Sequence, residues 1–286
     1  MEAGSPSRTA ILTAIHRAAH FLIDDPPKIL ADSFARAFAG FSSDTELLAS
    51  IDSYAFPDFV AYRTFFALRN RYAEDQLAAA AASGTGQYVI LGAGLDSFAY
   101  RCPDALSELR IFEVDHPSTQ AWKRARLAEL GIEAPAPLRF VPIDFECGTL
   151  TAGLDAGGVD RKAKAFFSWL GVTQYLTRDA VRKALREIAS ATVPDSGIVA
   201  TFVVPGSILD RAQTEHLAAI SARTASVGEP WLSFFEPQEM IALMKEAGFV
   251  DVCCFGPEDA ARTYLSGRRD GLRMPGHAWL IKGCVG

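Results

Sequence analysis

The segment that most constrains this chain is 87–97, an apolar run that ends in two glycines one residue apart. Residues 87–91 read as a buried strand, Gly92 and Gly94 as a tight turn, and the residues from 95 onward as a helix. Glycine leaves room for a ligand to approach the backbone, and a helix that begins there offers free N–H groups. Strand, glycine turn and helix in this order predict a site for a nucleotide-like ligand.

A second apolar strand, 110–115, follows about twenty residues later, where a Rossmann-like sheet binds ribose hydroxyls. It carries Glu113 and Asp115 at its carboxyl end. The third glycine of a dinucleotide fingerprint is replaced by Ser97, and Asp96 stands inside the loop. A carboxylate there would repel a pyrophosphate but suits a ligand with a cationic end. The pattern therefore favours S-adenosylmethionine over NAD.

A third strand end carries residues suited to adenine. The strand expected at 138–143 is followed by Asp144 and Phe145. The carboxylate can accept from the exocyclic N6–H group, and the aromatic ring offers apolar area. Asp144 alone would also serve to cap a turn, but ligand-type residues at three successive strand ends indicate one cofactor site.

Apolar periodicity divides the chain into a helical beginning and an alternating remainder. Alternation of strands and helices builds a mostly parallel sheet with helices on both faces. We expect helices at 8–23, 28–40, 58–82, 95–106, 117–131, 177–192 and 236–247, and strands at 87–91, 110–115, 138–143, 164–170, 197–204, 249–255 and 277–282.

The organisation predicts a single α/β domain over residues 1–286. A long insertion beside the carboxyl edge of a sheet is usually a lid or a substrate wall. We expect a helical cap over 1–83, a cofactor-binding half over 84–204, a lid insertion after the fifth strand over 205–235, and the C-terminal part of the sheet over 236–286.

Composition narrows the classes of partner. The net charge is −6 and no long cluster of Lys and Arg occurs, so nucleic acid is not an expected partner. The five cysteines lack the spacing of a metal site and are read as reduced thiols, so no metal is expected. No apolar segment suits an export signal or a membrane span. We expect a cytoplasmic protein that acts on a small molecule; its oligomeric state is left open.

The runs VILGAGLDSFAYR, FEVDHP, VPIDF and FFSWLGVTQYLT resemble the leucine carboxyl methyltransferase family of class I S-adenosylmethionine-dependent methyltransferases. The resemblance extends from about residue 9 to the C-terminus and is densest over 63–176. It implies a Rossmann-like, seven-stranded, mostly parallel sheet whose last strand, 277–282, is antiparallel. It is strongest to the bacterial branch of small-molecule O-methyltransferases.

The resemblance also implies which residues contact the cofactor. Gly92, Asp115, Asp144 and Phe145 match family contacts. The family binds the methionine carboxylate with an arginine late in the N-terminal region. Arg69 is the preferred match, with Arg63 and Arg71 as alternatives, and Ala93, Gly94, Asp96, Glu113 and Leu170 complete the expected cofactor-binding set.

One position departs from the family pattern. Members that methylate the phosphatase C-terminus carry a glutamate after the fourth strand, near the amino-acid end of the cofactor, where this chain has Leu170. The ammonium group must then be held by backbone carbonyls or by Asp96. The departure favours the bacterial branch and argues against a protein C-terminal leucine as the acceptor.

The acceptor is expected among aromatic residues, and Trp169, Trp231 and Phe235 are the predicted contacts. A carboxylate acceptor is already ionised and needs no base, whereas a phenol benefits from one. No convincing catalytic base emerges; Tyr175 and His216 are weak candidates. His116 is read as a helix cap ahead of Pro117.

These features predict an S-adenosylmethionine-dependent O-methyltransferase of secondary metabolism. Its acceptor would be a carboxyl or hydroxyl group of a small, largely apolar, polyketide-like metabolite. An NAD(P)-dependent oxidoreductase is disfavoured by Asp96, by Ser97 and by the lack of a Tyr-x-x-x-Lys motif. A cofactor-binding protein that has lost catalysis stays open because of Leu170 and the missing base.

Overall fold

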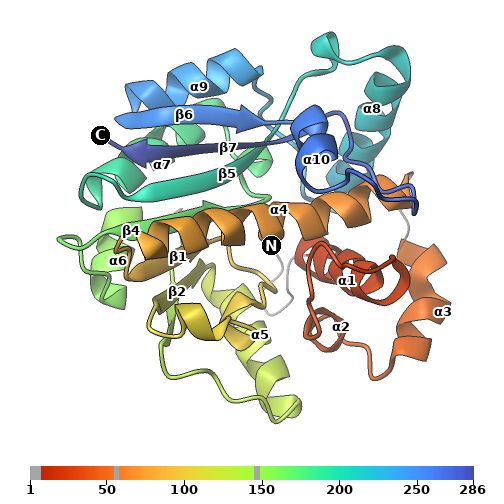
Figure 1. Ribbon diagram of the computed structural model, residues 1–286, viewed down its shortest axis with the longest axis horizontal. Coiled ribbons are helices and arrows are strands. Elements are labelled where there is room, and N and C mark those ends of the chain that lie inside the picture. Colours follow the sequence, from red (N-terminus) through yellow and green to blue (C-terminus); the bar gives the residue numbers. More distant parts are fainter. Residues whose placement is uncertain (1–7, 55–57, 145–148) are drawn as a thin grey trace.

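A seven-stranded sheet forms the centre of the protein (Figure 1). The computed structural model describes residues 8–54, 58–144 and 149–286. The strand order is β3-β2-β1-β4-β5-β7-β6, and β7 runs antiparallel to both of its neighbours. The other neighbouring pairs are parallel. The expected class I methyltransferase fold, including the antiparallel last strand, is confirmed.

Each of the seven expected strands is present. The central strands are continuous apolar runs, as parallel strands buried on both faces require. The strands are β1 (Gln87–Leu91), β2 (Arg110–Asp115), β3 (Leu138–Pro142), β4 (Ala165–Trp169), β5 (Gly197–Val203), β6 (Phe249–Phe255) and β7 (Ala278–Val285).

Helices cover both faces of the sheet. One core cluster joins α4 to Tyr88, Phe166 and Leu280 of the sheet, and a second joins α6, α7 and α9 to the opposite face. The helices are α1 (Arg8–Ile23), α2 (Ala35–Phe38), α3 (Asp44–Tyr54), α4 (Phe59–Ala82), α5 (Pro117–Glu129), α6 (Leu150–Gly157), α7 (Arg178–Ser190), α8 (Arg211–Ser226), α9 (Pro237–Glu246) and α10 (Pro257–Thr263).

The helix expected at 28–40 is wrong. Only α2 is helical in that stretch, and α3, α6 and α10 were not expected. The backbone N–H groups of Ile29 and Leu30 donate to Nε2 of His20, at 3.1 and 3.3 Å, instead of to helical carbonyl oxygens. The carboxylate of Asp32 then accepts from Ala35 N at 3.0 Å, where α2 begins.

The helix expected at 95–106 is also wrong. Two short 3₁₀ helices, η1 (Phe98–Tyr100) and η2 (Asp104–Leu106), take its place. The carboxylate of Asp96 accepts from the N–H group of Phe98 at 2.8 Å and forms a local turn. Pro103 disfavours helical backbone at Cys102. The glycine turn is therefore not followed by the N-terminus of an α-helix, so this stretch does not present the free helical N–H groups that the sequence predicted.

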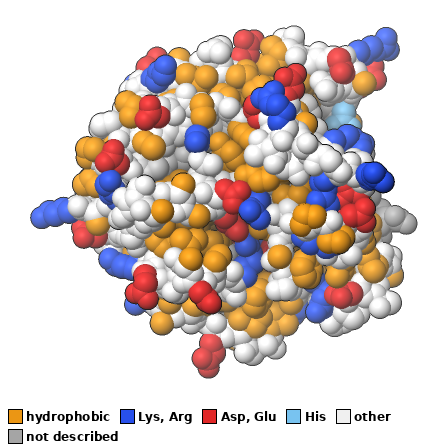
Figure 2. Space-filling view, in the orientation of Figure 1, with side chains coloured by type: hydrophobic (Ala, Val, Ile, Leu, Met, Phe, Trp, Pro, Cys, Tyr) orange, Lys and Arg blue, Asp and Glu red, His pale blue; other side chains and the backbone are white. Residues whose placement is uncertain are grey.

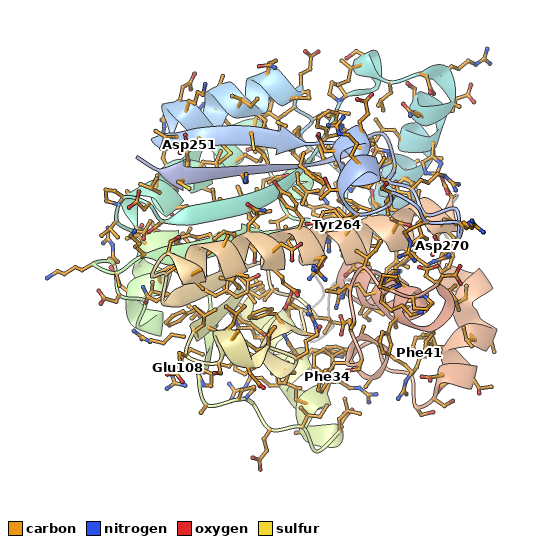
Figure 3. All side chains as sticks on the ribbon, viewed as in Figure 1. Phe34, Phe41, Glu108, Asp251, Tyr264 and Asp270 are labelled. Atoms are coloured by element: carbon orange, nitrogen blue, oxygen red, sulfur yellow. The ribbon has the colours of Figure 1, made fainter. Side chains whose placement is uncertain are left out.

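The C-terminal segment after α10 fastens the N-terminal helices to the sheet. Figure 3 labels Tyr264 and Asp270 in this segment. The hydroxyl of Tyr264 donates to Asp75 of α4 at 2.7 Å, and Asp270 accepts from the backbone N–H of Asp25 at 3.2 Å. Hydrogen bonds between residues that are far apart in the sequence thus hold the N-terminal helices in place.

Charged side chains are mixed over the surface. On the face shown in Figure 2, basic and acidic groups are interspersed and neither sign gathers into a broad patch. Within the described residues, no helix has both the length and the apolar character that crossing a membrane requires. The expectations of a cytoplasmic location and of no nucleic-acid partner stay predictions.

An ion pair lies between β2 and α5 inside the protein. The ammonium of Lys123 donates to Glu113 at 2.6 Å and to the carbonyl oxygen of Asp96 at 2.7 Å. Glu113 is 1% exposed and Lys123 2%. Burial raises the pKa of Glu113 to about 7, and the neighbouring ammonium opposes that rise.

Lys123→Met removes the counter-ion and leaves Glu113 buried without one. We expect the free energy of unfolding, measured by urea denaturation, to fall by about 3–5 kcal/mol. Lys183→Met is the control, because Lys183 is 70% exposed and pairs with Glu187 at 3.7 Å. The control should change stability by less than about 1 kcal/mol. Equal losses in the two variants would contradict the structural role of the pair.

Candidate cofactor and acceptor site

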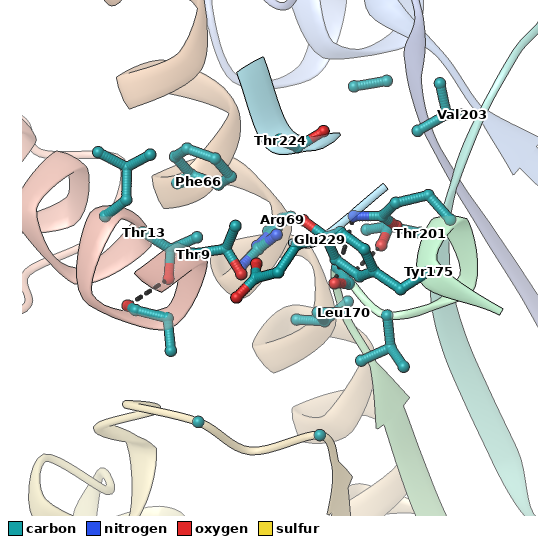
Figure 4. Close-up of a pocket in the computed structure, with 18 of the residues that line it drawn as sticks. Thr9, Thr13, Phe66, Arg69, Leu170, Tyr175, Thr201, Val203, Thr224 and Glu229 are labelled. Atoms are coloured by element: carbon teal, nitrogen blue, oxygen red, sulfur yellow. Dashed lines mark hydrogen bonds between the residues drawn. The ribbon is translucent and has the colours of Figure 1, made fainter. Parts of the chain in front are cut away.

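A cavity of about 440 Å³ lies at the carboxyl ends of β1, β4 and β5. Its walls come from α1, α4, α8 and the loop after α8, together with the segments that follow the strands (Figure 4). Most of the wall is apolar, which is typical of small-molecule sites. Ligands of open α/β sheets bind at this edge, so the cavity is the candidate site.

The glycine turn after β1 forms part of the wall. Gly92 (φ +66°), Ala93 and Gly94 (φ +49°) all line the cavity. A Cβ atom at Gly92 would lie 2.4 Å from Val172 Cγ2, and one at Gly94 would lie 3.3 Å from Ala10 Cβ. The predicted glycine turn is present, and both positive φ and close packing against Val172 and Ala10 favour glycine there. The approach of a ligand to the turn stays a prediction.

Asp115 ends β2 and fixes this turn. Its carboxylate accepts from the backbone N–H groups of Gly94 and His116. Burial raises the pKa of Asp115, and these two N–H donors oppose the rise. Asp115 also lines the cavity. His116 caps α5 as predicted, because its Nδ1 accepts from Ser118 N at 3.2 Å.

The three candidate arginines have different surroundings. Arg63 pairs with Asp24 at 2.6 Å and Arg71 with Asp75 at 2.8 Å, whereas Arg69 lines the cavity. Within the described residues, no carboxylate forms an ion pair with Arg69, and its Nε has no hydrogen-bond partner. Burial lowers the pKa of Arg69 to about 9. A buried cation without a counter-ion is costly, so this guanidinium favours an anionic ligand group.

Neighbouring residues leave room for this guanidinium. It lies over the ring of Phe66, 4.8 Å from the centroid. A Cβ atom at Gly171 (φ +75°) would lie 2.5 Å from Nη1 of Arg69. The glycine after Leu170 is therefore what allows Arg69 to reach the end of β4, a requirement that the sequence alone did not reveal.

Two acidic residues line the same cavity. The carboxylate of Asp96 accepts from Asn70 Nδ2 at 3.0 Å and from Phe98 N at 2.8 Å. Glu229, in the loop after α8, was not anticipated (Figure 4). Leu170 lies in the wall as well. The cavity wall thus contains two acids, Asp96 and Glu229, that come from segments other than the one that carries Leu170.

Two of the acidic residues predicted to bind the cofactor, Glu113 and Asp144, do not line this cavity. Glu113 does not line the cavity, because its side chain is buried against α5 and paired with Lys123. Asp144 follows β3 at the same sheet edge but is not among the lining residues. Phe145 lies outside the described residues.

Two predicted acceptor contacts are core residues. Trp169 is 4% exposed and Phe235 is 1% exposed, and both belong to the cluster on the α7 and α9 side of the sheet. Side chains alternate along β4, so Trp169 points away from α4 and from the cavity. Phe235 packs beneath the guanidinium of Arg178, 4.5 Å from the ring centroid. Trp231 does line the cavity.

A pair of polar rings lies at the end of the cavity nearest β7. Oη of Tyr62 and Nε2 of His277 are 2.7 Å apart, and both residues are buried. The ring of Trp231 lies 6.0 Å from that of His277. Burial lowers the pKa of His277 to about 3 and raises that of Tyr62, so both side chains are neutral at physiological pH.

The two weak candidates for a base are placed differently. Tyr175 lines the cavity, and burial raises its pKa, so its hydroxyl stays protonated. His216 is not a lining residue; its ring stacks on Tyr62 with the centroids 5.7 Å apart.

The sequence carries a signal for the part of the wall that α4 contributes, of which Arg69 was already predicted. Tyr62, Phe65, Phe66 and Arg69 all line the cavity from α4. Their spacing of three, four and seven residues places them on one helix face. His277 had no comparable signal, because 215 residues separate it from its partner Tyr62.

The fold is that of the class I methyltransferases. Two solved structures share the fold. A protein from Thermobifida fusca has 17% sequence identity and a TM-score of 0.57, over 96% of this chain and 94% of its own. A DUF574 family protein from Streptomyces avermitilis has 13% identity and a TM-score of 0.58, over 96% and 97%.

The chain belongs to the leucine carboxyl methyltransferase family, whose model matches residues 10–189. YktD of Bacillus subtilis, named for S-adenosyl-L-methionine-dependent methyl transfer, is 35% identical over 66% of this chain and 62% of its own length. A protein of the same designation from Mycobacterium sp. (strain JLS) is 31% identical over 81% of this chain and 76% of its own. This chain thus spans less than two thirds of YktD.

Among the residues that the structure describes, no group of three or more His, Cys, Asp or Glu side chains is arranged to hold a metal ion.

The low pKa of His277 makes stability depend on pH. In the unfolded chain the imidazole returns to its ordinary pKa of 6.5, so acid protonates the unfolded state first. The contribution of neutral His277 is complete above pH 6.5 and is lost as the pH falls from there towards 3. When the pH is lowered from 7.5 to 5, the free energy of unfolding should fall by about 2 kcal/mol less in His277→Phe than in the wild type. Urea denaturation across this range measures it, and parallel profiles would contradict it.

Proposed function

We propose that this protein transfers a methyl group from S-adenosylmethionine to an oxygen atom of a small, largely apolar acceptor. The observation that carries the proposal is the guanidinium of Arg69. It is buried in the cavity beside the end of β4, and no described side chain forms an ion pair with it. The carboxylate of the methionine moiety is the ligand group that would complete it.

The rest of the lining fits the other parts of the donor. The carboxylate of Asp115 can accept hydrogen bonds from the ribose hydroxyls, and the neighbouring Gly94 has no side chain in the way. Asp96 and Glu229 place negative charge in the same cavity as Arg69. These carboxylates suit the ammonium group of the donor, because this chain has Leu170 at the position where some family members have a glutamate. Ala93 supplies apolar contact, and Asp144 with Phe145 stay the proposed adenine contacts.

When bound, S-adenosylmethionine supplies an electrophilic methyl group on a sulfonium. The protein contributes alignment and exclusion of water, because positive charge is lost in an in-line displacement. Thr9, Ala10 and Thr13 of α1 line the cavity, with Ala10 next to Gly94, and Phe65 and Phe66 of α4 add apolar wall.

Residues 205–235 are proposed to form a lid over the acceptor. Ile220, Thr224 and Trp231 line the cavity from this segment. The N–H group of Leu232 donates to the carbonyl oxygen of Gln174 at 2.6 Å, and Phe235 N donates to Val203 O at 3.0 Å. The segment is therefore anchored after Trp231, so any opening would involve α8 rather than the anchored end.

Calorimetric titration tests the donor. S-adenosylmethionine and S-adenosylhomocysteine should bind and NAD should not, because Asp96 and the absent third glycine disfavour a pyrophosphate. Binding of NAD without S-adenosylmethionine would support an oxidoreductase instead. Formation of S-adenosylhomocysteine with an acceptor separates the enzyme from a cofactor-binding protein that has lost catalysis.

Arg69→Met should weaken S-adenosylhomocysteine binding at least about tenfold, or 1.4 kcal/mol, because a charge-assisted contact is lost. Arg71→Met is the matched control, since Arg71 lies on the exposed side of α4 and pairs with Asp75. 5′-Methylthioadenosine lacks the carboxylate, so its affinity should be the same in Arg69→Met and wild type. An equal loss for both ligands would make Arg69 a structural residue.

A further inference from the structure

Asn70 carries a buried hydrogen-bond acceptor that no group of the described chain satisfies. The residue lies in α4, is 5% exposed and lines the cavity. Its Nδ2 donates to the carboxylate of Asp96 at 3.0 Å, whereas its Oδ1 has no hydrogen-bond partner among the described residues. A buried acceptor without a partner is destabilising, and such atoms are rare in native proteins. The amide oxygen therefore indicates a donor that arrives with a ligand.

The carboxylate of Asp96 determines the orientation of this amide. An ionised carboxylate can only accept hydrogen bonds, so the NH₂ group of Asn70 must face it and the oxygen must point elsewhere. Asp96 is itself held in place. Its second carboxylate oxygen accepts from Phe98 N at 2.8 Å, and its backbone carbonyl oxygen accepts from Lys123 Nζ at 2.7 Å. The side chain of Asn70 is thus fixed with its acceptor unused.

The preceding residue of the same helix has the opposite kind of unsatisfied group. Arg69 extends from α4 into the cavity (Figure 4), and its Nε has no hydrogen-bond partner among the described residues. A cationic donor and a neutral acceptor, both unsatisfied, therefore come from successive positions. The carboxylate and the ammonium of an α-amino acid are attached to one carbon atom, so a site that binds both needs a donor and an acceptor close together.

We propose that Asn70 recognises the ammonium group of the donor, with its Oδ1 as the hydrogen-bond acceptor, while Arg69 binds the carboxylate. The assignment rests on the proposed function and names the side chain that replaces the glutamate missing at Leu170. Asp96 acts through Asn70 as a positioning residue. It holds the amide and polarises it, because hydrogen bonds in a chain strengthen one another.

Calorimetric titration with three ligands that share a nucleoside separates the two contacts. S-adenosylhomocysteine has both charged groups, 5′-S-(3-carboxypropyl)-5′-thioadenosine lacks the ammonium, and 5′-S-(3-aminopropyl)-5′-thioadenosine lacks the carboxylate. Asn70→Leu should weaken S-adenosylhomocysteine and the aminopropyl ligand at least about tenfold, because a hydrogen bond to a charged group is lost. The affinity of the carboxypropyl ligand should change less than about twofold. Arg69→Met should give the reverse pattern.

Gln87→Leu is the matched control, because it also removes a buried amide. Gln87 is 2% exposed, and its Nε2 donates to the carbonyl oxygen of Asp160 at 2.9 Å. It lies at the start of β1, at the opposite end of the strand from the glycine turn, and does not line the cavity. This variant should bind all three ligands as the wild type does. Thermal unfolding shows whether each variant is folded.

A second measurement needs no variant. Asn70 is the one asparagine of the chain, so protein made with ¹⁵N-labelled asparagine has a single labelled side-chain amide. In nuclear magnetic resonance spectra, S-adenosylhomocysteine and the aminopropyl ligand should shift the signals of this NH₂ group. The carboxypropyl ligand should shift them less, because it has no ammonium to bind the amide oxygen.

Either of two results would overturn the inference. One is an equal loss of affinity for the carboxypropyl and aminopropyl ligands in Asn70→Leu, because the residue would then act on the site as a whole. The other is a side-chain amide signal that does not move in protein saturated with S-adenosylhomocysteine, which decides the matter even if Asn70→Leu does not fold. Failure of S-adenosylhomocysteine to bind the wild type would contradict the proposed function, and this assignment with it.

Discussion

The cavity depends on the hydrogen bonds that the carboxylate of Asp115 accepts from the backbone. By holding Gly94 N, Asp115 keeps the turn after β1 against the end of β2. With the turn fixed, α1 can pack on it, and Arg17 can donate to Leu95 O on its far side. Removing a carboxylate from water, even in part, is costly unless it is hydrogen-bonded, so the turn and the half-buried Asp115 stabilise each other. The wall that α1 contributes follows from this arrangement.

The strands were easier to predict from the sequence than the helices, because the strands depend on local sequence pattern and two of the helices depend on side-chain contacts. Each strand is a mainly apolar run with a glycine, an acid or a proline at its end or within two residues of it, and such patterns can be recognised without tertiary context. The stretch 95–106 has helical composition, but a side-chain bond from Asp96 and a proline after Cys102 prevent the helix. The stretch 28–40 depends on His20, a residue of another element, so its own sequence could not reveal its structure.

The same distinction applies to the site. Gly92, Gly94 and Asp115 lie where strands end, so their position in the sequence was enough to predict that they lie at the edge of the sheet that forms the cavity. Trp169 is a large aromatic residue at a strand end too, yet the alternation of side chains along β4 directs it into the core. An aromatic residue serves a core as well as a ligand, and only the facing helix decides between them. Likewise, Arg69 could be chosen over Arg63 and Arg71 only once the structure showed that the latter two are paired with Asp24 and Asp75.

The antiparallel direction of β7 has a consequence for the order in which the protein is made. The first residue of β7, Ala278, pairs with Val203, the last residue of β5, which brings His277 to an edge otherwise built from earlier residues. Synthesis proceeds from the N-terminus, so the glycine turn and Arg69 are made long before His277. Because a domain folds as a unit, the cavity can be completed only after β7 has been made.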